Sequence, residues 1–329
     1  MESPERREGM SQSINLNAVD RVEILTLQDN YIEITATDNS QIIRRAIGVS
    51  ADGMIDNAIQ AEHGFATLVM VTTGDRTRTL LFDFGFSEEG AAYNAQKLGI
   101  DMTAVEQMAL SHGHSDHFGG FEKLVQMIGK EGIELVVHPG AFKYPRYLKF
   151  NETLKAYFPR VEQDRITGAG CRLVATSDPY PLLDGDALFL GEIARTNDFE
   201  KGFPIAFCMD DGIEKWDPIE DDTSVVMNLK GKGLIVLSGC AHAGIINSVN
   251  HARTVTGIDK VHAVMGGFHL SGPLFEPIIG RTTEELKKCN PDYVVPCHCT
   301  GRNAIMHIER EMPDQFILNM SGTKLTFAS

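Results

Sequence analysis

Residues 111–120 read SHGHSDHFGG, and no other segment limits the possible folds of this chain as much. The segment places His112, His114, Asp116 and His117 within six positions. Imidazoles and carboxylates are the usual protein ligands of zinc and related divalent ions. In an extended stretch, residues two apart point to the same side, so His112 and His114 could bind one ion together. If the chain then turns into a helix, Asp116 and His117 face another side. The spacing therefore predicts two adjacent metal ions.

The residues on either side of the motif predict where it lies. The apolar-rich run 105–110 precedes it and Phe118-Gly119-Gly120 follows it, whereas a solvated polar loop would have polar neighbours. This context is typical of a loop at the end of a buried strand, where functional sites usually lie. We expect zinc in both positions, and iron or manganese would also suit such ligands.

Charge and hydropathy exclude some function classes. The net charge of −15 argues against nucleic acid as a partner, because phosphate backbones bind basic surfaces. The sequence contains no apolar run of about 18 residues, the length that a membrane helix needs. Residues 1–20 begin MESPERREGMSQS, which lacks the apolar core of a secretion signal, and we expect them to be disordered. Six scattered cysteines without such a signal favour a reducing cytoplasm.

Strand and helix patterns alternate over residues 21–329. Short runs rich in branched and aromatic residues predict strands at Val22–Leu27, Phe65–Thr72, Thr79–Phe84, Leu135–His138, Ala187–Leu190, Ser224–Asn228, Leu234–Ser238, Val261–Met265 and Tyr293–Pro296. Helical periodicity predicts helices at Ala91–Leu98, Phe121–Ile128, Ile245–Thr256, Thr282–Cys289 and Asn303–Met312. This order predicts one α/β domain, a four-layer αββα sandwich of two mixed β-sheets flanked by helices. The oligomeric state stays open, and a homo-oligomer is compatible with the sequence.

The less regular stretch at about 139–223 predicts a lid or binding insertion over the site. A surface elaboration that only aids folding or assembly is the alternative. Cationic side chains in the stretch could pair with a phosphate group of a small-molecule substrate, or could be ordinary surface charge: Lys143, Arg146, Arg195 and Lys201. Thr300 and Arg302 precede a predicted helix, whose N-terminal amides could also hold an anion.

Two further histidines follow apolar strands and could complete the metal shells. His242 lies in LIVLSGCAHAG and His298 in YVVPCHCTG, and strand ends are where sites form in layered α/β folds. Cys240, two residues before His242, could ligate a metal as a thiolate or could simply be a small buried residue.

Four other residues are candidates for supporting roles. His269 follows a predicted strand and could contact substrate or transfer a proton, although a structural role fits equally. His63 and Glu62 lie in AEHGF, and Glu62 could orient a ligand from outside the metal shell. Asp83 ends the strand TLLFDFG and could hydrogen-bond a metal ligand in the same way, or only form a turn.

These motifs together resemble the metallo-β-lactamase superfamily. LLFDFG, SHGHSDH, SGCAH and VVPCHCTG occur in the order of its metal-site motifs. Within it, the chain is similar to the branch of dihydropterin–ribofuranosylaminobenzene-phosphate synthases, on the segments AEHGF, LSHGHSDHFGG, VVHPGAF, GEIARTNDFE, DPIEDDTSVV, LSGCAHAGIINSV, GGFHL and PCHCTGRNA. The resemblance spans roughly residues 22–318.

The resemblance implies an αββα fold with a dinuclear site between the sheets. It assigns His112, His114 and His242 to one metal, and Asp116, His117 and His298 to the other. The chain departs from the hydrolytic members at two places. Their H-T-P-G segment is absent, and the corresponding residues 221–224 read DDTS. Gly239-Cys240 stands where those members have Gly-Asp with a bridging aspartate.

Three functions are compatible with these motifs. In a hydrolase, two ions activate a bridging water, and the metal-bound hydroxide attacks a phosphorylated or ester-type substrate, with Asp116 orienting the water and His269 transferring a proton. The branch resemblance implies instead a synthase that condenses a dihydropterin pyrophosphate with a ribofuranosylaminobenzene phosphate. A non-catalytic metal-containing sensor of a small ligand is the third possibility.

Overall fold

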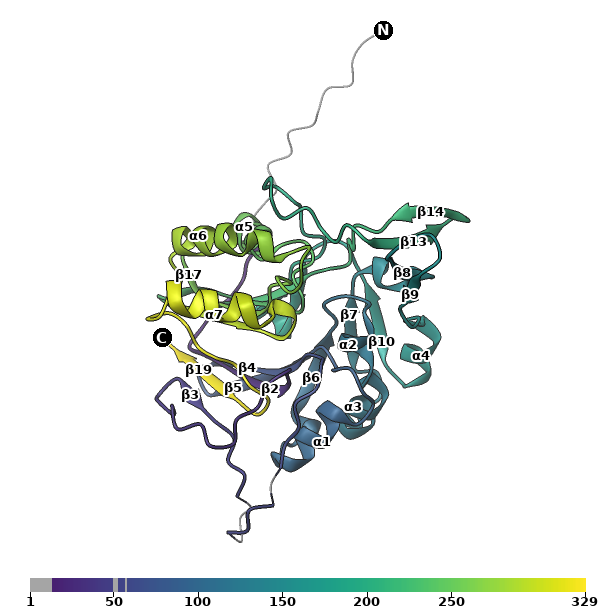
Figure 1. Cartoon of the computed structure of the whole chain (residues 1–329). Coiled ribbons are helices and arrows are strands. Elements are labelled where there is room, and N and C mark those ends of the chain that lie inside the picture. Colours follow the sequence, from purple (N-terminus) through teal and green to yellow (C-terminus); the bar gives the residue numbers. More distant parts are fainter. Residues whose placement is uncertain (1–13, 50–52, 57) are drawn as a thin grey trace.

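Two β-sheets pack face to face in the computed structural model of the chain, which describes residues 14–49, 53–56 and 58–329 (Figure 1). The first sheet is mixed and has the strand order β10-β7-β6-β5-β4-β2-β19-β3. Its strands are β2 (Arg21–Gln28), β3 (Ile43–Arg44), β4 (Ala66–Thr73), β5 (Arg76–Phe82), β6 (Val105–Ala109), β7 (Glu134–Val137), β10 (Arg172–Ala175) and β19 (Lys324–Ala328).

The second sheet is also mixed, with the order β11-β12-β15-β16-β17-β18, and β1 adds to β15. Its strands β16, β17 and β18 run parallel to one another, so their carboxyl ends lie at one edge. The strands are β1 (Ala18–Val19), β11 (Tyr180–Leu182), β12 (Ala187–Phe189), β15 (Ser224–Leu229), β16 (Gly233–Ser238), β17 (Val261–Gly267) and β18 (Tyr293–Cys297).

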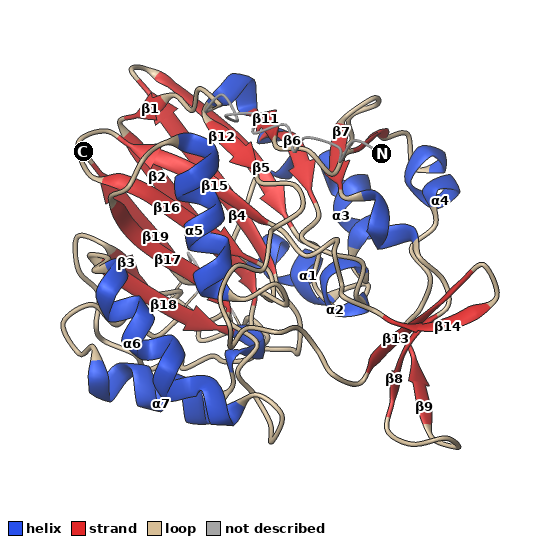
Figure 2. Cartoon of the chain, turned by 90° about the horizontal axis from the view of Figure 1, so that it is seen from above, coloured by secondary structure: helices blue, strands red, loops and turns tan. Residues whose placement is uncertain are grey.

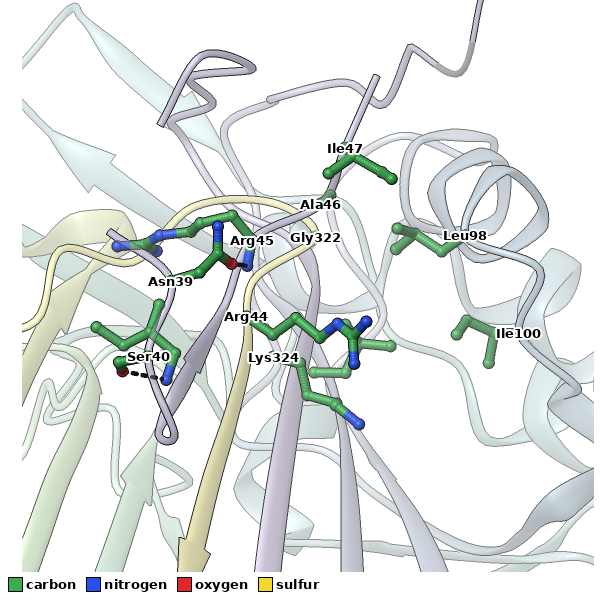
Figure 3. Close-up of a pocket in the computed structure, with 12 residues that line it drawn as sticks. Asn39, Ser40, Arg44, Arg45, Ala46, Ile47, Leu98, Ile100, Gly322 and Lys324 are labelled. Carbon is green, nitrogen blue, oxygen red and sulfur yellow. Dashed lines mark hydrogen bonds between the residues drawn. The ribbon is translucent and has the colours of Figure 1, made fainter. Parts of the chain in front are cut away.

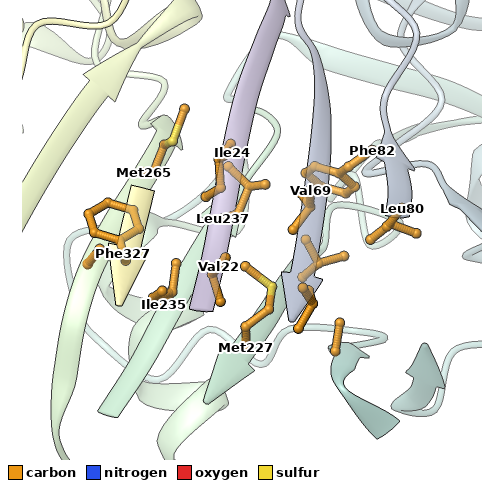
Figure 4. Close-up of a cluster of buried hydrophobic side chains, with 14 of the residues drawn as sticks. Val22, Ile24, Val69, Leu80, Phe82, Met227, Ile235, Leu237, Met265 and Phe327 are labelled. Carbon is orange, nitrogen blue, oxygen red and sulfur yellow. The ribbon is translucent and has the colours of Figure 1, made fainter. Parts of the chain in front are cut away.

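A continuous apolar core fills the space between the two sheets (Figure 4). Residues two apart on one strand enter it from the same face, as the period of a strand requires. Val22 and Ile24 of β2 contribute from the first sheet, and Ile235 and Leu237 of β16 from the second. The alternate residues of β16, Leu234 and Val236, belong to the outer apolar cluster beneath the helices.

Helices cover both outer faces, so the predicted αββα sandwich is confirmed. The first sheet packs against α1 (Gly90–Lys97) and α3 (Phe121–Ile128). The second packs against α5 (Ile245–Thr256), α6 (Ile279–Cys289) and α7 (Arg302–Glu311), which lie across its strands in Figure 2. The predicted bounds of α3 and α5 match the structure, and the other helices differ at their ends. Two short helices, α2 (Ser115–Phe118) and α4 (Gln163–Gly168), complete the set in the described residues.

The stretch 139–223 is more regular than its sequence predicts. It supplies β10 to the first sheet and β11 and β12 to the second. The rest includes a small antiparallel sheet of β8 (Arg146–Lys149), β9 (Lys155–Tyr157), β13 (Ala206–Asp210) and β14 (Ile213–Trp216), which projects from one end of the sandwich (Figure 2). That the projecting sheet and the loops beside it form a lid or insertion stays a prediction.

Both ends of the described chain take part in the sheets, which the sequence did not predict. Residues 14–20 were expected to be disordered, but β1 pairs with β15, and Leu16 and Val19 are buried. Residues 1–13 lie outside the described part of the chain. β19 was not predicted, yet it pairs with both β2 and β3 near the other end. No helix among the described residues is long and apolar enough to cross a membrane.

The core between the sheets predicts a specific loss of stability. Ile235→Ala removes a fully buried side chain and should lower the free energy of unfolding by about 2–5 kcal/mol. Ile213→Ala on β14, where the side chain is 60% exposed, should change it by less than about 0.5 kcal/mol. Denaturant titration of the two variants and the wild type measures both. Equal losses would contradict the placement of β16 in the core.

Candidate metal centre

The predicted ligands come together where strands of both sheets end. His112, His114 and His117 follow β6 of the first sheet, whereas His242 and His298 follow β16 and β18 of the second. Parallel strands place the loops after their carboxyl ends at one edge, so these side chains meet across the top of the core. The sandwich itself therefore brings together residues that are far apart in sequence.

The local geometry of the histidine motif agrees with its predicted change of direction. His114 is extended, with φ −83° and ψ 150°, and α2 begins at the next residue, Ser115. The Nε2 atom of His112 lies 3.0 Å from Nδ1 of His114, so the two rings face one point. Asp116 and His117 belong to α2 and turn toward a second point.

The first group of potential ligands consists of His112, His114 and His242, whose ring nitrogens lie within 4.8 Å of one another. Burial lowers the pKa of His114 to about 3, and it also lowers the pKa of His112 and His242 well below the ordinary value. Neither ring nitrogen of His242 has a hydrogen-bond partner among the described residues, although both are buried. Buried polar atoms are rarely left unpaired, so three neutral imidazoles here fit a divalent ion.

The second group consists of Asp116, His117, Cys240 and His298. The Nε2 atom of His117 lies 3.1 Å from Sγ of Cys240 and 3.2 Å from Nε2 of His298, which is 3.3 Å from Oδ2 of Asp116. Burial lowers the pKa of His117, but the charges of Asp83 and Asp116 outweigh it and raise that pKa to about 9. An ion that binds Nε2 must therefore displace a proton, and the carboxylate and thiol donors of the group favour a cation.

Asp83 orients His117 from behind. Its Oδ2 atom accepts a hydrogen bond from Nδ1 of His117 at 2.6 Å, which leaves Nε2 of that ring facing the second group. The same carboxylate accepts the backbone N–H and the hydroxyl of Ser111, each at 2.7 Å. Such a carboxylate–histidine pair fixes the tautomer and direction of a metal ligand. The position thus suits the supporting role that the sequence suggested.

The sequence reasoning did not find the residues that orient His298. The Asp29 carboxylate accepts the backbone N–H of His298 at 2.9 Å, and Oδ1 of Asn30 lies 3.2 Å from its Nδ1. Asn319 donates to the other oxygen of Asp29 at 2.7 Å. Asp29 and Asn30 follow the end of β2, and a polar pair at a strand end was the only available signal.

Two predicted phosphate-binding residues are engaged elsewhere. Arg146 is buried, and its guanidinium binds Asp217 at 2.6 Å and Asp221 at 2.7 and 3.0 Å. Asp221 also accepts the backbone N–H of Gly113 at 2.8 Å, so this ion pair supports the histidine loop. Lys143 pairs with Glu220 at 2.7 Å. The Asp217 and Asp221 carboxylates accept from three of the five guanidinium N–H groups of Arg146, and its role as a phosphate ligand stays a prediction.

Three other candidates also have structural partners. Arg195 donates to the backbone carbonyls of Pro218 and His242, the latter at 3.3 Å. The Thr300 hydroxyl accepts from the backbone N–H of Phe268 at 2.9 Å and donates to the Gly266 carbonyl. Glu62 accepts from the Ser87 hydroxyl at 2.6 Å, near the start of α1, instead of orienting a potential metal ligand. Arg302 is the first residue of α7 and is exposed.

A cleft of about 330 Å³ opens onto both groups of ligands. Its apolar wall includes Phe158, whose ring stacks on His114 at 4.0 Å, and Phe203. His63 lies at the cleft with its side chain 62% exposed and its Nε2 atom 3.4 Å from Asp116. His269 lines the cleft too. A larger hollow of about 720 Å³, beside Arg44 and Leu98, contains none of these residues (Figure 3).

This geometry agrees with comparisons of the chain with known proteins. The sequence model of the metallo-beta-lactamase superfamily matches residues 62–298. The chain belongs to this superfamily. The chain is an enzyme of this superfamily, as are a relative and a solved structure described next.

Two relatives and one solved structure illustrate the match. The chain is 30% identical over 317 residues to the 7,8-dihydropterin-6-methyl-4-(beta-D-ribofuranosyl)-aminobenzene-5'-phosphate synthase of Methanocaldococcus jannaschii, covering 95% of this chain and 99% of that protein. It is 28% identical over 255 residues to an uncharacterized protein of the same organism, covering 76% and 88%. Tm1679, a metal-dependent hydrolase of the beta-lactamase superfamily, has the same fold, with a TM-score of 0.70 and 24% identity over 94% of this chain and 100% of that one.

The Asp83–His117 pair predicts a defect in metal affinity in this superfamily member. Asp83→Asn keeps the shape of the side chain but removes the charge behind His117, and it should weaken metal binding about 10–100-fold. Asp292→Asn is the matched control, because Asp292 makes the same 2.6 Å contact with His262, which belongs to neither ligand group. Competition with a chromogenic chelator measures both affinities. An unchanged affinity of Asp83→Asn would contradict the orienting role.

Proposed function

We propose that the protein is a metal-dependent hydrolase that uses a dinuclear site on a small, phosphorylated or ester-type substrate. The observation that carries this proposal is the convergence of two separate groups of ligand atoms on one cleft. His112, His114 and His242 would hold one divalent ion. Asp116, His117 and His298 would hold the other, with Cys240 as an additional donor. Zinc suits both donor sets, and iron or manganese would also fit.

Two ions in these positions would activate a water molecule for attack and polarise an oxygen of the substrate. The side chains have the remaining tasks. Asp116, held anionic although burial opposes it, would accept a hydrogen bond from the attacking water and so orient it. His269 lines the cleft, and its Nδ1 is buried without a hydrogen-bond partner among the described residues. It would transfer a proton to the leaving group.

A condensation reaction is the second candidate, and the full-length similarity to the archaeal synthase favours it. In this case the metal centre would hold the pyrophosphate leaving group of a dihydropterin pyrophosphate. The amino nitrogen of a ribofuranosylaminobenzene phosphate would attack the carbon that carries the pyrophosphate, the C–O bond to the pyrophosphate would break, and the nitrogen would lose a proton. The substitution of Cys240 for a bridging carboxylate supports this alternative, because it departs from the hydrolytic members at the site itself.

Metal content tests the site directly. The wild-type protein, purified without added metal, should contain about two transition-metal ions per chain. His242→Ala and His298→Ala should each lower the content toward one, because each removes a donor from a different group. His307→Ala, on α7, is the control and should leave the content unchanged. Elemental analysis of folded protein gives these values. One ion or none in the wild type would contradict a dinuclear centre.

A substrate series distinguishes hydrolysis from condensation. The metal-loaded protein would be assayed with phosphodiesters, lactones, thioesters and a dihydropterin pyrophosphate, the last with and without a ribofuranosylaminobenzene phosphate. A hydrolase releases product from a single substrate, whereas a synthase needs both partners. His114→Ala and His298→Ala should abolish turnover in either case while circular dichroism shows a retained fold. Wild-type turnover in either variant would refute its assignment as a ligand.

A further inference from the structure

A second pocket adjoins the metal cleft and shares two of its histidines. This side pocket has a volume of about 210 Å³, and His242 and His269 line both it and the cleft. The rest of its wall is mainly apolar and includes Phe199, Phe268, Leu270, Leu274, Phe275 and Ile278. The loop after β17 and the segment before α6 supply most of these residues. None of them was a candidate in the sequence.

The buried charge in the side pocket is already satisfied. Glu200 accepts the backbone N–H groups of Ile246 and Asn247 at 2.9 Å each, at the start of α5, and the side-chain amide of Asn197 at 2.6 Å. Gly244 permits this approach, because a Cβ there would lie 2.2 Å from the carboxylate. Glu200 therefore holds the wall in place. Both of its carboxylate oxygens already accept hydrogen bonds, so the pocket does not need a cationic ligand.

The wall of the side pocket is fixed from outside as well. Arg281 pairs with Asp198 and lies over the Phe199 ring at 4.6 Å. The indole N–H of Trp216 donates to the Phe203 carbonyl at 2.9 Å. These contacts hold the segment 197–204 between the side pocket and the cleft. The pocket is thus formed before any ligand binds, which lowers the entropic cost of occupying it.

The aromatic rings where the side pocket meets the metal cleft favour a flat ligand. Phe275 meets His269 at 4.5 Å and Phe203 at 5.1 Å, with the ring planes 85° and 70° apart. Edge-to-face and offset contacts of this kind are the arrangements that aromatic rings prefer. An apolar cavity of about 150 Å³ binds benzene, so the side pocket has room for one ring with a short substituent.

We propose that the side pocket binds a single aromatic ring of the substrate, while the reacting group of the same molecule lies in the metal cleft. The link to the reacting group rests on the proposed function, whereas the binding of the ring does not. His269 lies between the two spaces and would contact the bond that joins the ring-bearing part to the reacting group. Phe275 and Leu274 then select substrates by the shape of this part.

Fluorobenzene, observed by fluorine NMR on the metal-loaded protein, tests the side pocket alone. The wild type should bind it, and Leu274→Trp should weaken binding about tenfold or more by filling the mouth of the pocket. Leu274 is 47% exposed, so the larger side chain need not disturb the core. Ile278→Trp fills the pocket from another side. Met306→Trp, at a 52% exposed position on α7, is the control and should bind like the wild type. If the wild type did not bind fluorobenzene, or if both filled variants bound it as tightly as the wild type, the aromatic pocket would be refuted.

Two non-hydrolysable anions test the link to the metal cleft. Calorimetry should show that phenylphosphonate binds the wild type about tenfold more tightly than methylphosphonate. Leu274→Trp should abolish this preference and leave the affinity for methylphosphonate unchanged. Equal affinities in the wild type would refute a shared substrate. If neither phosphonate binds but fluorobenzene does, the phosphorylated substrate class of the proposed function is wrong and the aromatic pocket stands.

Discussion

The hydrogen bonds of the Asp83 carboxylate are the contact on which the metal centre depends. One buried side chain binds the backbone and hydroxyl of Ser111 and the ring of His117, and it thereby joins the end of β5 to the loop after β6. β5 and β6 are parallel neighbours, so their ends are already side by side. The hydrogen bonds of the carboxylate to Ser111 and His117 then fix the orientation of the histidine motif. The ion pair of Arg146 with Asp221 does the same from the other side of the loop, through the backbone of Gly113.

The loops at this edge also contain backbone conformations that side chains normally avoid. Asp83, Ala241, His269 and His298 have positive φ angles of 61°, 53°, 46° and 49°. A residue other than glycine in the left-handed region costs on the order of 1–3 kcal/mol, and such residues are concentrated at functional sites. Each of the four follows a different strand; His269, His298 and the His242 that follows Ala241 line the cleft, and Asp83 binds His117. The packing of the core between the sheets stabilises the fold and so offsets the free-energy cost of this backbone strain.

The histidine motif and the layered fold could be predicted because both depend on short-range patterns. His112 and His114 lie on one extended stretch, and α2 begins at the next residue, so spacing alone separated the two groups. His242 and His298 could be found because each follows an apolar strand. The roles of Asp29 and Glu200 could not, because the backbone N–H groups that they bind, at His298 and at Ile246, are more than 40 positions away in the sequence. The ion pairs of Arg146 could not be predicted either, since a cationic residue in the sequence does not show which carboxylates will surround it.

The metal ligands and the residues that would choose a substrate come from different parts of the fold. Strand ends of the sandwich hold every potential ligand, and the sheets position these ends with little freedom. The opposite wall of the cleft comes from the stretch 139–223, through Leu148, Phe158 and Phe203, and the side pocket from the segment before α6. One superfamily scaffold can therefore support different reactions. Under the proposed function, the metal centre would supply activated water or hold a phosphate, and the aromatic walls would determine which molecule reaches it. The identity of the substrate would then depend on these walls more than on the histidines.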